Sequence, residues 1–142
     1  MIERETIHAC CVAIGDHGVL LIGQSGSGKS DLALRLIDRG AALVSDDYSN
    51  LSIKGKGLYA SPPERIAGKI EVRGIGIIEM AHQMSARIGL AVYLGDAVTR
   101  MPDERREAKF LGVDIAATSI SAHESSAPIK VELALKQAIE SR

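Results

Sequence analysis

The order of apolar and polar positions in the first third of the chain predicts strand, strand, helix and strand. Two apolar runs, 7–14 and 19–22, are separated by the turn-forming residues 15–18, which predicts a β-hairpin. Apolar residues then recur at helical spacing over about 29–39, and 42–44 forms a further short strand. We therefore expect a βαβ unit with a right-handed crossover.

Beyond residue 47 the pattern becomes more strand-like. Residues 48–60 alternate apolar with polar positions around a glycine-containing turn, which predicts a second β-hairpin. Segments 70–74 and 90–94 are predicted as strands, the first alternating and the second continuously apolar. The charge-dense segment 99–110 is predicted as a surface loop or short helix. A proline then opens a last amphipathic helix over 129–139.

The composition favours an α/β fold with an aliphatic core. With 142 residues the chain is expected to form one domain over residues 1–142. Hydrophobic residues make up 46%, aromatic residues only 3%, and tryptophan is absent. Such a core suits parallel strands that are buried on both faces.

Charge and hydropathy exclude several classes of partner. The 17 basic and 18 acidic side chains leave a net charge of −1, so nothing favours nucleic acid or an anionic membrane as a partner. The N-terminus is charged, and no apolar stretch reaches the length of a membrane span. We expect a soluble, cytoplasmic protein.

The two cysteines, Cys10 and Cys11, are adjacent in the first apolar run. Neighbours on a strand point to opposite faces, so a disulfide between them is not expected. Both are predicted to be buried as small hydrophobic residues.

The link between the second strand and the helix carries the clearest functional signal. It matches the phosphate-binding pattern G-x-x-x-x-G-K-[ST], in which backbone N–H groups and a helix N-terminus face a phosphate. Lys29 is expected to reach the outer phosphates and the Ser30 hydroxyl to hold magnesium. A glycine-rich turn without a ligand is the alternative. The predicted nucleotide-binding residues are Gly23, Gln24, Ser25, Gly26, Ser27, Gly28, Lys29 and Ser30.

Acidic residues that follow predicted strands are the candidates for metal binding and proton transfer. Asp46 and Asp47 directly follow the 42–44 strand, and Asp96 follows the 90–94 strand. Ligands of α/β sheets gather outside the carboxyl ends of strands. Adjacent carboxylates can divide the work, one on magnesium and one accepting a proton from an attacking hydroxyl. A solvated turn is the alternative.

Three further side chains are open to two interpretations. Glu71 and Arg73 flank one residue of a predicted strand and therefore share a face, where they either complete a metal and phosphate site or form an ordinary ion pair. His8 lies in the first apolar run, where a lone histidine is more often a packed strand residue than a catalyst.

The phosphate loop, the Asp46-Asp47 pair and segment 70–78 together resemble HPr kinase/phosphorylase. Residues 71–78 fit that family's signature E-[IV]-R-G-x-G-I-I, which is far more specific than a phosphate loop. The resemblance runs from about residue 8 to residue 78, with a weaker continuation to the final helix. It implies a P-loop kinase-like core similar to phosphoenolpyruvate carboxykinase, with a β-sheet flanked by helices and β-hairpins.

The family resemblance also implies cofactors, a partner and residue roles. It implies ATP and Mg²⁺ as cofactors, HPr (the phosphocarrier of the bacterial sugar phosphotransferase system) as the substrate, and assembly as a homo-hexamer. The acidic pair would supply the base that deprotonates the target serine, although adjacent spacing leaves open which residue does so, and His8 would support that base. The implied catalytic residues are His8, Lys29, Asp46, Asp47 and Arg73, and the implied magnesium ligands are Ser30, Asp47 and Glu71.

The chain departs from the family pattern in three places. It begins almost at His8, so we expect a short form with the catalytic domain only, and Ala9 stands where the family usually has glycine. An arginine that the family places before a Leu-Gly step is replaced by Phe110, and Arg100, Arg105 or Arg106 are candidates to substitute for it. Residues 122–128 replace an R-P-G-R-N-like loop tied to dephosphorylation.

We therefore expect an ATP- and magnesium-dependent protein serine kinase that acts on HPr, with weak or absent phosphorylase activity. One alternative is a small-molecule kinase with a carboxykinase-like core. Another is a non-catalytic nucleotide sensor that binds a partner protein. A GTPase switch is disfavoured because the chain has no N-K-x-D motif.

Overall fold

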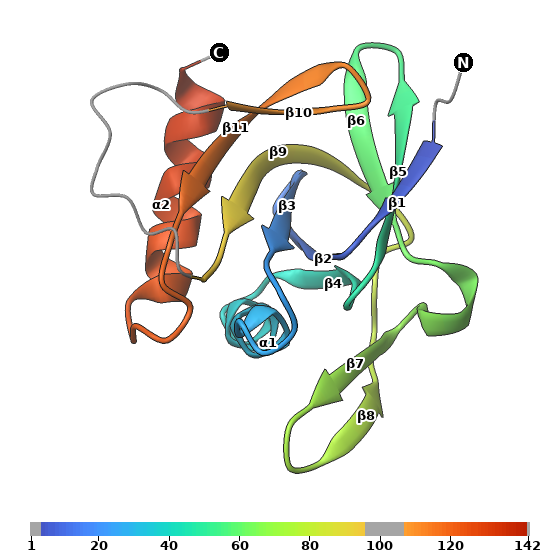
Figure 1. Ribbon diagram of the computed structural model, residues 1–142, viewed down its shortest axis with the longest axis vertical. Helices are drawn as coiled ribbons and strands as arrows, with labels where there is room; N and C mark the ends of the chain where they lie inside the picture. The colour runs from blue at the N-terminus through green and yellow to red at the C-terminus, as the bar shows by residue number, and fades with distance from the viewer. Residues whose placement is uncertain (1–3, 96–106, 142) are drawn as a thin grey trace.

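The computed structural model describes residues 4–95 and 107–141 and has a mixed α/β architecture (Figure 1). A curled nine-stranded sheet carries two helices on one side, and a separate two-stranded hairpin projects away from it. In chain order the elements are β1 (Arg4–Ile7), β2 (Ala9–Ile14), β3 (His17–Ile22), α1 (Lys29–Asp38), β4 (Ala42–Ser45), β5 (Ser49–Lys54), β6 (Gly57–Ser61), the short 3-10 helix Glu64–Ile66, β7 (Lys69–Val72), β8 (Gly76–Glu79), β9 (Ala86–Tyr93), β10 (Glu107–Phe110), β11 (Val113–Ser119) and α2 (Ala127–Glu140).

The predicted β-hairpin and βαβ unit both form, with one refinement. β2 pairs antiparallel with β3, and β4 also pairs antiparallel with β2. β3 and β4 therefore run in the same direction, as the crossover through α1 requires, but β2 lies between them. β3 continues into parallel pairing with β9, and β9 with β11, so that three neighbouring strands run parallel in the middle of the sheet.

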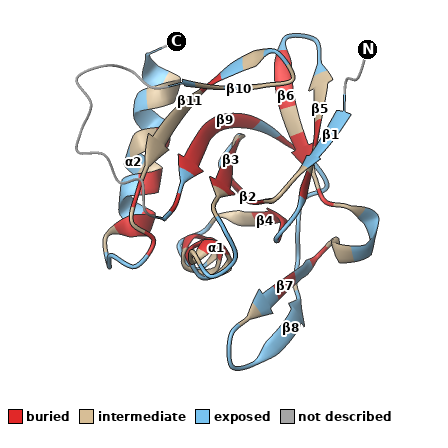
Figure 2. Cartoon of the chain, viewed as in Figure 1, coloured by how far each residue is buried: buried red, intermediate tan, exposed pale blue. Residues whose placement is uncertain are grey.

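Two hydrophobic cores lie on the two faces of this sheet (Figure 2). The first packs α1 and α2 against the sheet and contains Leu21 and Leu36. The second lies on the opposite face, where the sheet curls over itself, and contains Leu20 and Leu51. Alternation along β2 sends Cys10 into the first core and leaves Cys11 in the second, so the prediction of two free, buried thiols is confirmed.

The hairpin predicted for 48–60 is confirmed as β5 and β6, which are joined by a two-residue turn. The strand predicted for 70–74 forms as β7 over Lys69–Val72, and the residues after it return as β8 in a hairpin. The C-terminal helix begins at Ala127, with proline in its first turn, as the sequence indicated.

The prediction for 99–110 was wrong over its described part. Glu107–Phe110 is strand β10, which pairs antiparallel with β11, a strand that the sequence pattern did not reveal. The two are joined by Leu111 and Gly112, both with positive φ (50° and 83°), as a tight hairpin turn requires. Residues 99–106 lie outside the described part of the chain.

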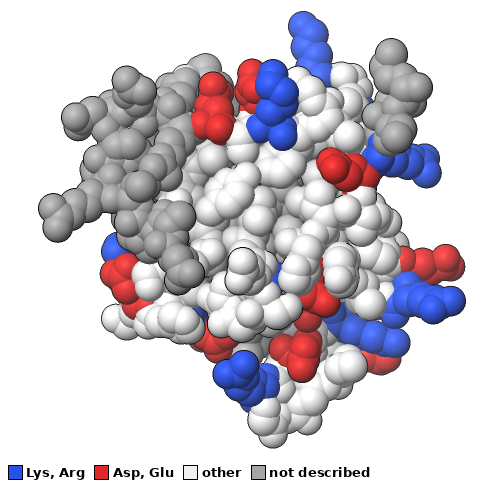
Figure 3. All heavy atoms as spheres, in the orientation of Figure 1, with Lys and Arg blue, Asp and Glu red and all other residues white. Residues whose placement is uncertain are grey.

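On the face seen in Figure 3, acidic and basic side chains lie interspersed around the edge, and neither sign forms a wide field there. This distribution agrees with the net charge of −1. Within the described ranges, no helix combines the length and the apolar character needed to cross a bilayer.

Candidate active site

The phosphate loop connects the end of β3 to the start of α1. Gly26 and Gly28 adopt positive φ values of 85° and 97°, which side-chain-bearing residues rarely adopt, so glycine is needed at both turns of the loop. Lys29 is only 6% exposed, and its Nζ donates to the carbonyls of Gly23 (2.7 Å) and Gln24 (3.2 Å). The ammonium is thus held across the mouth of the loop, with one of its three N–H donors left for a ligand.

A buried hydroxyl in the same loop supports its interpretation as an anion cradle. The Ser27 hydroxyl is buried, contacts Gly23 and has no hydrogen-bond partner among the described residues. Buried polar groups without a partner are rare in folded proteins. A phosphate bound in the loop would offer this donor an acceptor.

Asp46 follows β4 and forms a buried junction between three segments. Its Oδ1 accepts from the Ser30 hydroxyl (2.6 Å) and from the Cys10 thiol (3.1 Å), and its Oδ2 accepts from the backbone N–H of Glu71 (2.9 Å). Asp46 is only 6% exposed. Asp46 is therefore the carboxylate that faces the first turn of α1.

Asp47, the next residue, is arranged differently. Its backbone has a positive φ of 68°, and its N–H donates to the Cys10 sulfur (3.3 Å). The carboxylate turns outward, and its Oδ1 lies 2.8 Å from His8 Nε2, with 57% of the Asp47 side chain exposed. The His8 ring is stacked on Tyr48 with centroids 5.0 Å apart. The acidic pair thus splits into one buried carboxylate and one accessible carboxylate beside an imidazole.

Cys10 links the two halves of the pair, a role that the sequence did not indicate. Its thiol donates to Asp46 and accepts from the Asp47 backbone. Burial, aided by the nearby Asp46 charge, raises the pKa of this thiol far above its usual value, so the thiol stays protonated and can keep donating. Its spacing of two residues from His8, which puts both on one face of an extended chain, is the one available signal in the sequence.

Glu71 and Arg73 lie at the edge of this group, on the β7–β8 hairpin (Figure 1). The Glu71 backbone is tied to Asp46, whereas both side chains are exposed. The predicted site residues His8, Ser30, Asp46, Asp47 and Glu71 are therefore brought together from four separate segments of the chain.

The donor set near Ser30 fits magnesium. A serine hydroxyl and one or two carboxylates, completed by water and substrate phosphates, are the ordinary protein contribution to a Mg²⁺ site. Within residues 4–95 and 107–141, no cluster of three or more His, Cys, Asp or Glu forms a closed metal site. Ser30 and Asp46, already 2.6 Å apart, would hold the ion at the end of the phosphate loop.

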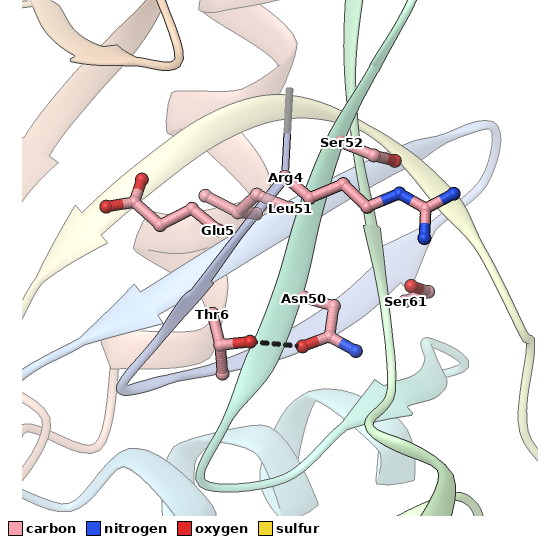
Figure 4. A pocket seen from close by; sticks show the side chains of 7 residues that line it. All are labelled: Arg4, Glu5, Thr6, Asn50, Leu51, Ser52 and Ser61. Carbon is pink, nitrogen blue, oxygen red and sulfur yellow. Dashed lines mark hydrogen bonds between the residues drawn. The ribbon is translucent and has the colours of Figure 1, made fainter. Parts of the chain in front are cut away.

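A polar pocket on the β1–β5–β6 layer is not part of this group (Figure 4). Its lining includes Arg4 and the Thr6–Asn50 hydrogen bond of 2.6 Å. It shares no residue with the phosphate loop, the acidic pair or β7. Of the remaining candidates, Asp96, Arg100, Arg105 and Arg106 lie outside the described residues.

Comparisons with known proteins identify the family of the chain. Residues 1–138 match the family model described as the HPr serine kinase C-terminal domain. HPr kinase/phosphorylase of Streptococcus uberis is 34% identical over 126 residues, covering 80% of this chain and 41% of the relative, and that of Streptococcus salivarius is 35% identical with the same coverage. The chain thus spans about two fifths of the length of these curated relatives.

A solved structure gives the same result for the fold. The Hpr(Ser) kinase/phosphatase from Coxiella burnetii superposes with a TM-score of 0.85 at 28% identity, covering 96% of this chain and 92% of that one. The P-loop kinase-like fold that the resemblance implied is thereby confirmed. With a family model that spans nearly all of its length, the chain belongs to the HPr serine kinase C-terminal domain family.

Proposed function

We propose that this chain, as one catalytic domain over residues 1–142, is an ATP- and magnesium-dependent protein serine kinase that phosphorylates HPr. The observation that carries the proposal is the division of the acidic pair: a buried carboxylate on Ser30, and an accessible one on His8, both next to a phosphate loop. The family membership and the names of the relatives support HPr as the protein substrate.

The phosphate loop would bind the donor. Residues 23–30 present backbone N–H groups and the N-terminus of α1 to the phosphates, and Lys29 places a positive charge at the loop mouth. Ser30 and Asp46 would hold magnesium, which when bound neutralises charge on the phosphates. The family resemblance implies Asp47 as a metal ligand. Asp47 contacts His8, whereas Asp46 contacts Ser30, so we favour Asp46 for that role.

Asp47 is the group we assign to the proton transfer. Its exposed carboxylate would accept the proton of the target serine hydroxyl as the serine oxygen bonds to the γ-phosphorus and the bond to the ADP oxygen breaks. His8, 2.8 Å away, would orient the carboxylate. Arg73 and Glu71, exposed on β7 and just beyond it, would face the transferred group and the metal from the hairpin side.

Transfer of labelled γ-phosphate from ATP to a serine of HPr is the decisive assay. We expect transfer by the wild type in the presence of Mg²⁺ and none by Lys29→Ala. Lys69→Ala, which removes a lysine from the exposed face of β7, is the matched control and should retain activity. A wild type that does not transfer, or a Lys29→Ala variant that does so at the full rate, refutes the proposal.

We further propose that phosphorylase activity is weak or absent, because residues 122–128 differ from the loop that the family resemblance ties to dephosphorylation. Incubation of phosphoserine-HPr with inorganic phosphate should then release little pyrophosphate. Rapid pyrophosphate release would contradict this part of the proposal.

Self-association, as a hexamer by family resemblance, and a cytoplasmic location complete the proposal. The β7–β8 hairpin exposes Ile75 and Ile77, each more than 70% accessible, which is unusual for isoleucine and is surface that a second copy could bury. Light scattering after gel filtration measures the mass. Ile77→Ser should lower it if the hairpin forms the contact, whereas a monomeric wild type would remove this part of the proposal.

A further inference from the structure

The segment that joins β11 to α2, residues 120–126, lies directly against the phosphate loop. A Cβ atom placed on Gly28 would meet the Ala122 Cβ at 2.9 Å and the His123 Cε1 at 3.6 Å. The contact follows from topology. β11 is parallel to β9 and β9 to β3, so this segment leaves the sheet at the same edge as the phosphate loop. Ligands of α/β sheets bind outside that edge.

The segment is anchored on both sides of His123. The guanidinium of Arg35, on α1, donates to the carbonyl of Ala122 and to the carbonyl of Glu124 (3.2 Å). The Glu124 carboxylate pairs with Lys130 Nζ at 2.8 Å. The backbone around His123 is therefore fixed to α1, while its imidazole is exposed beside the first turn of that helix.

A nucleotide whose phosphates sit in the loop needs a surface for its base, and the chain has few rings to offer. Tyr48 is stacked on His8 beside the acidic pair, Phe110 packs against the second core, and Tyr59 lies on β6, opposite the N-terminal end of β9. Tyr93 alternates along β9 with a residue of the first core, so it points to the face of the sheet away from α1. There is no tryptophan.

We infer that the imidazole of His123 forms one wall of the nucleobase subsite, against which the purine of the bound nucleoside triphosphate stacks. The inference deepens the proposed function and rests on it for the phosphate end of the ligand. Base-on-ring stacking tolerates any planar base and contributes measurably to affinity. Arg35 acts as a positioning residue, because it holds the two carbonyls that flank the ring.

The test compares two probes on the full chain: ATP with Mg²⁺, and inorganic tripolyphosphate with Mg²⁺, which has the phosphates but no base. Dissociation constants are measured by calorimetry for the wild type, His123→Ala and His123→Phe. His17→Ala, the same change at the opposite end of β3, is the matched control. We expect His123→Ala to weaken ATP binding about tenfold and His123→Phe to restore it. Tripolyphosphate has no base to stack on residue 123. Its dissociation constant should therefore stay within about twofold of the wild-type value in all variants.

The two probes separate failure of the subsite from failure of the proposed function. Unchanged ATP binding by His123→Ala, or equal weakening of both probes, overturns the inference about the base. Wild-type binding of tripolyphosphate no weaker than that of ATP also overturns it, while leaving the phosphate site in place. Absence of binding of either probe overturns the proposed nucleotide site itself, and the subsite with it.

Discussion

The same substitution at two adjacent positions should have different consequences: Asp46→Asn should mainly lower stability, and Asp47→Asn should mainly lower the rate of phosphate transfer. The Asp46 carboxylate accepts three hydrogen bonds, from Ser30, Cys10 and the Glu71 backbone. An asparagine amide offers one oxygen and one NH₂ group, so at least one of these donors would face another donor. A hydrogen bond to a charged group contributes about 1.5–3 kcal/mol, and a donor left unpaired adds a desolvation penalty. We expect Asp46→Asn to lower the free energy of unfolding by about 2 kcal/mol.

Asp47→Asn should leave the fold almost unchanged. The pair with His8 is partly exposed on both sides, so its loss should lower the free energy of unfolding by less than about 1 kcal/mol. Asparagine also tolerates the positive φ of 68° better than most residues. In the proposed reaction, asparagine cannot accept the proton of the target serine. Loss of a general base slows a reaction by about 10²–10⁴-fold.

The two effects are measured separately. Urea unfolding gives the free energy of unfolding of each variant, calorimetry gives the affinity for ATP with Mg²⁺, and phosphoryl transfer to HPr gives the rate. Asp47→Asn should bind ATP as the wild type does but transfer phosphate at a rate lower by at least about 100-fold. Asp46→Asn should be less stable and should need more Mg²⁺ for half-maximal ATP binding.

Either of two results would contradict these assignments of Asp46 and Asp47. If Asp47→Asn transfers phosphate within about threefold of the wild-type rate, Asp47 is not the base, since loss of a base slows a reaction by at least about 100-fold. If Asp46→Asn unfolds at the wild-type urea concentration, the three hydrogen bonds do not stabilise the fold as argued. Loss of transfer with Asp46→Asn alone would reverse the two assignments.

Three further predictions concern the loop and the thiols. Gly28→Ala should lower the free energy of unfolding, measured with urea, by about 1 kcal/mol more than Gly26→Ala. Both positions have positive φ, but only a Cβ at Gly28 would press against Ala122. Equal losses of stability in the two variants would contradict this prediction. Cys10→Val should lower the melting temperature, whereas Cys10→Ser should stay near the wild-type value. Serine can also donate to the Asp46 carboxylate and accept from the Asp47 backbone N–H. Equal melting temperatures of the two variants would show that the thiol contacts do not stabilise the fold. Burial raises the pKa of Cys11 from 9.0 to about 12, so its thiolate forms first in the unfolded chain and the free energy of unfolding should fall as the pH rises from 9 toward 12. Cys11→Ala should reduce that slope by up to about 1.4 kcal/mol per pH unit, measured by urea unfolding across that range.

The parts of the fold that depend on nearby residues could be predicted from the sequence. The β2–β3 hairpin, the phosphate loop with α1, and the β5–β6 hairpin are specified by patterns within about twenty residues of chain. The β10–β11 hairpin could not be predicted in this way, because the alternation of β10 is only four residues long and stands at the end of a charge-dense run. The pairing of β11 with β9, which leads the following segment to the phosphate loop, joins residues about 26 apart, such as Ala117 and Ala91.

The site shows the same limit at the level of single residues. Sequence spacing identified Asp46 and Asp47 as a pair but could not distinguish them, because their difference arises from one backbone angle and from partners in other segments. The sequence predicts Cys10 as a core residue, which is confirmed, but a thiol in an apolar run gives no indication of its polar contacts. His123 is exposed, and nothing in the sequence around it indicates that it lies beside Gly28 of the phosphate loop.

The antiparallel placement of β2 between β3 and β4 has a practical consequence for labelling the protein. His8, the phosphate loop and the acidic pair all lie where β2 begins and where β3 and β4 end. The Gly15-Asp16 turn therefore lies at the far end of the same strands, exposed and a full strand length from the chemistry. An affinity tag or fluorophore inserted there would leave the proposed nucleotide and protein substrate free to approach, whereas a label near the start of β2 would lie beside the site.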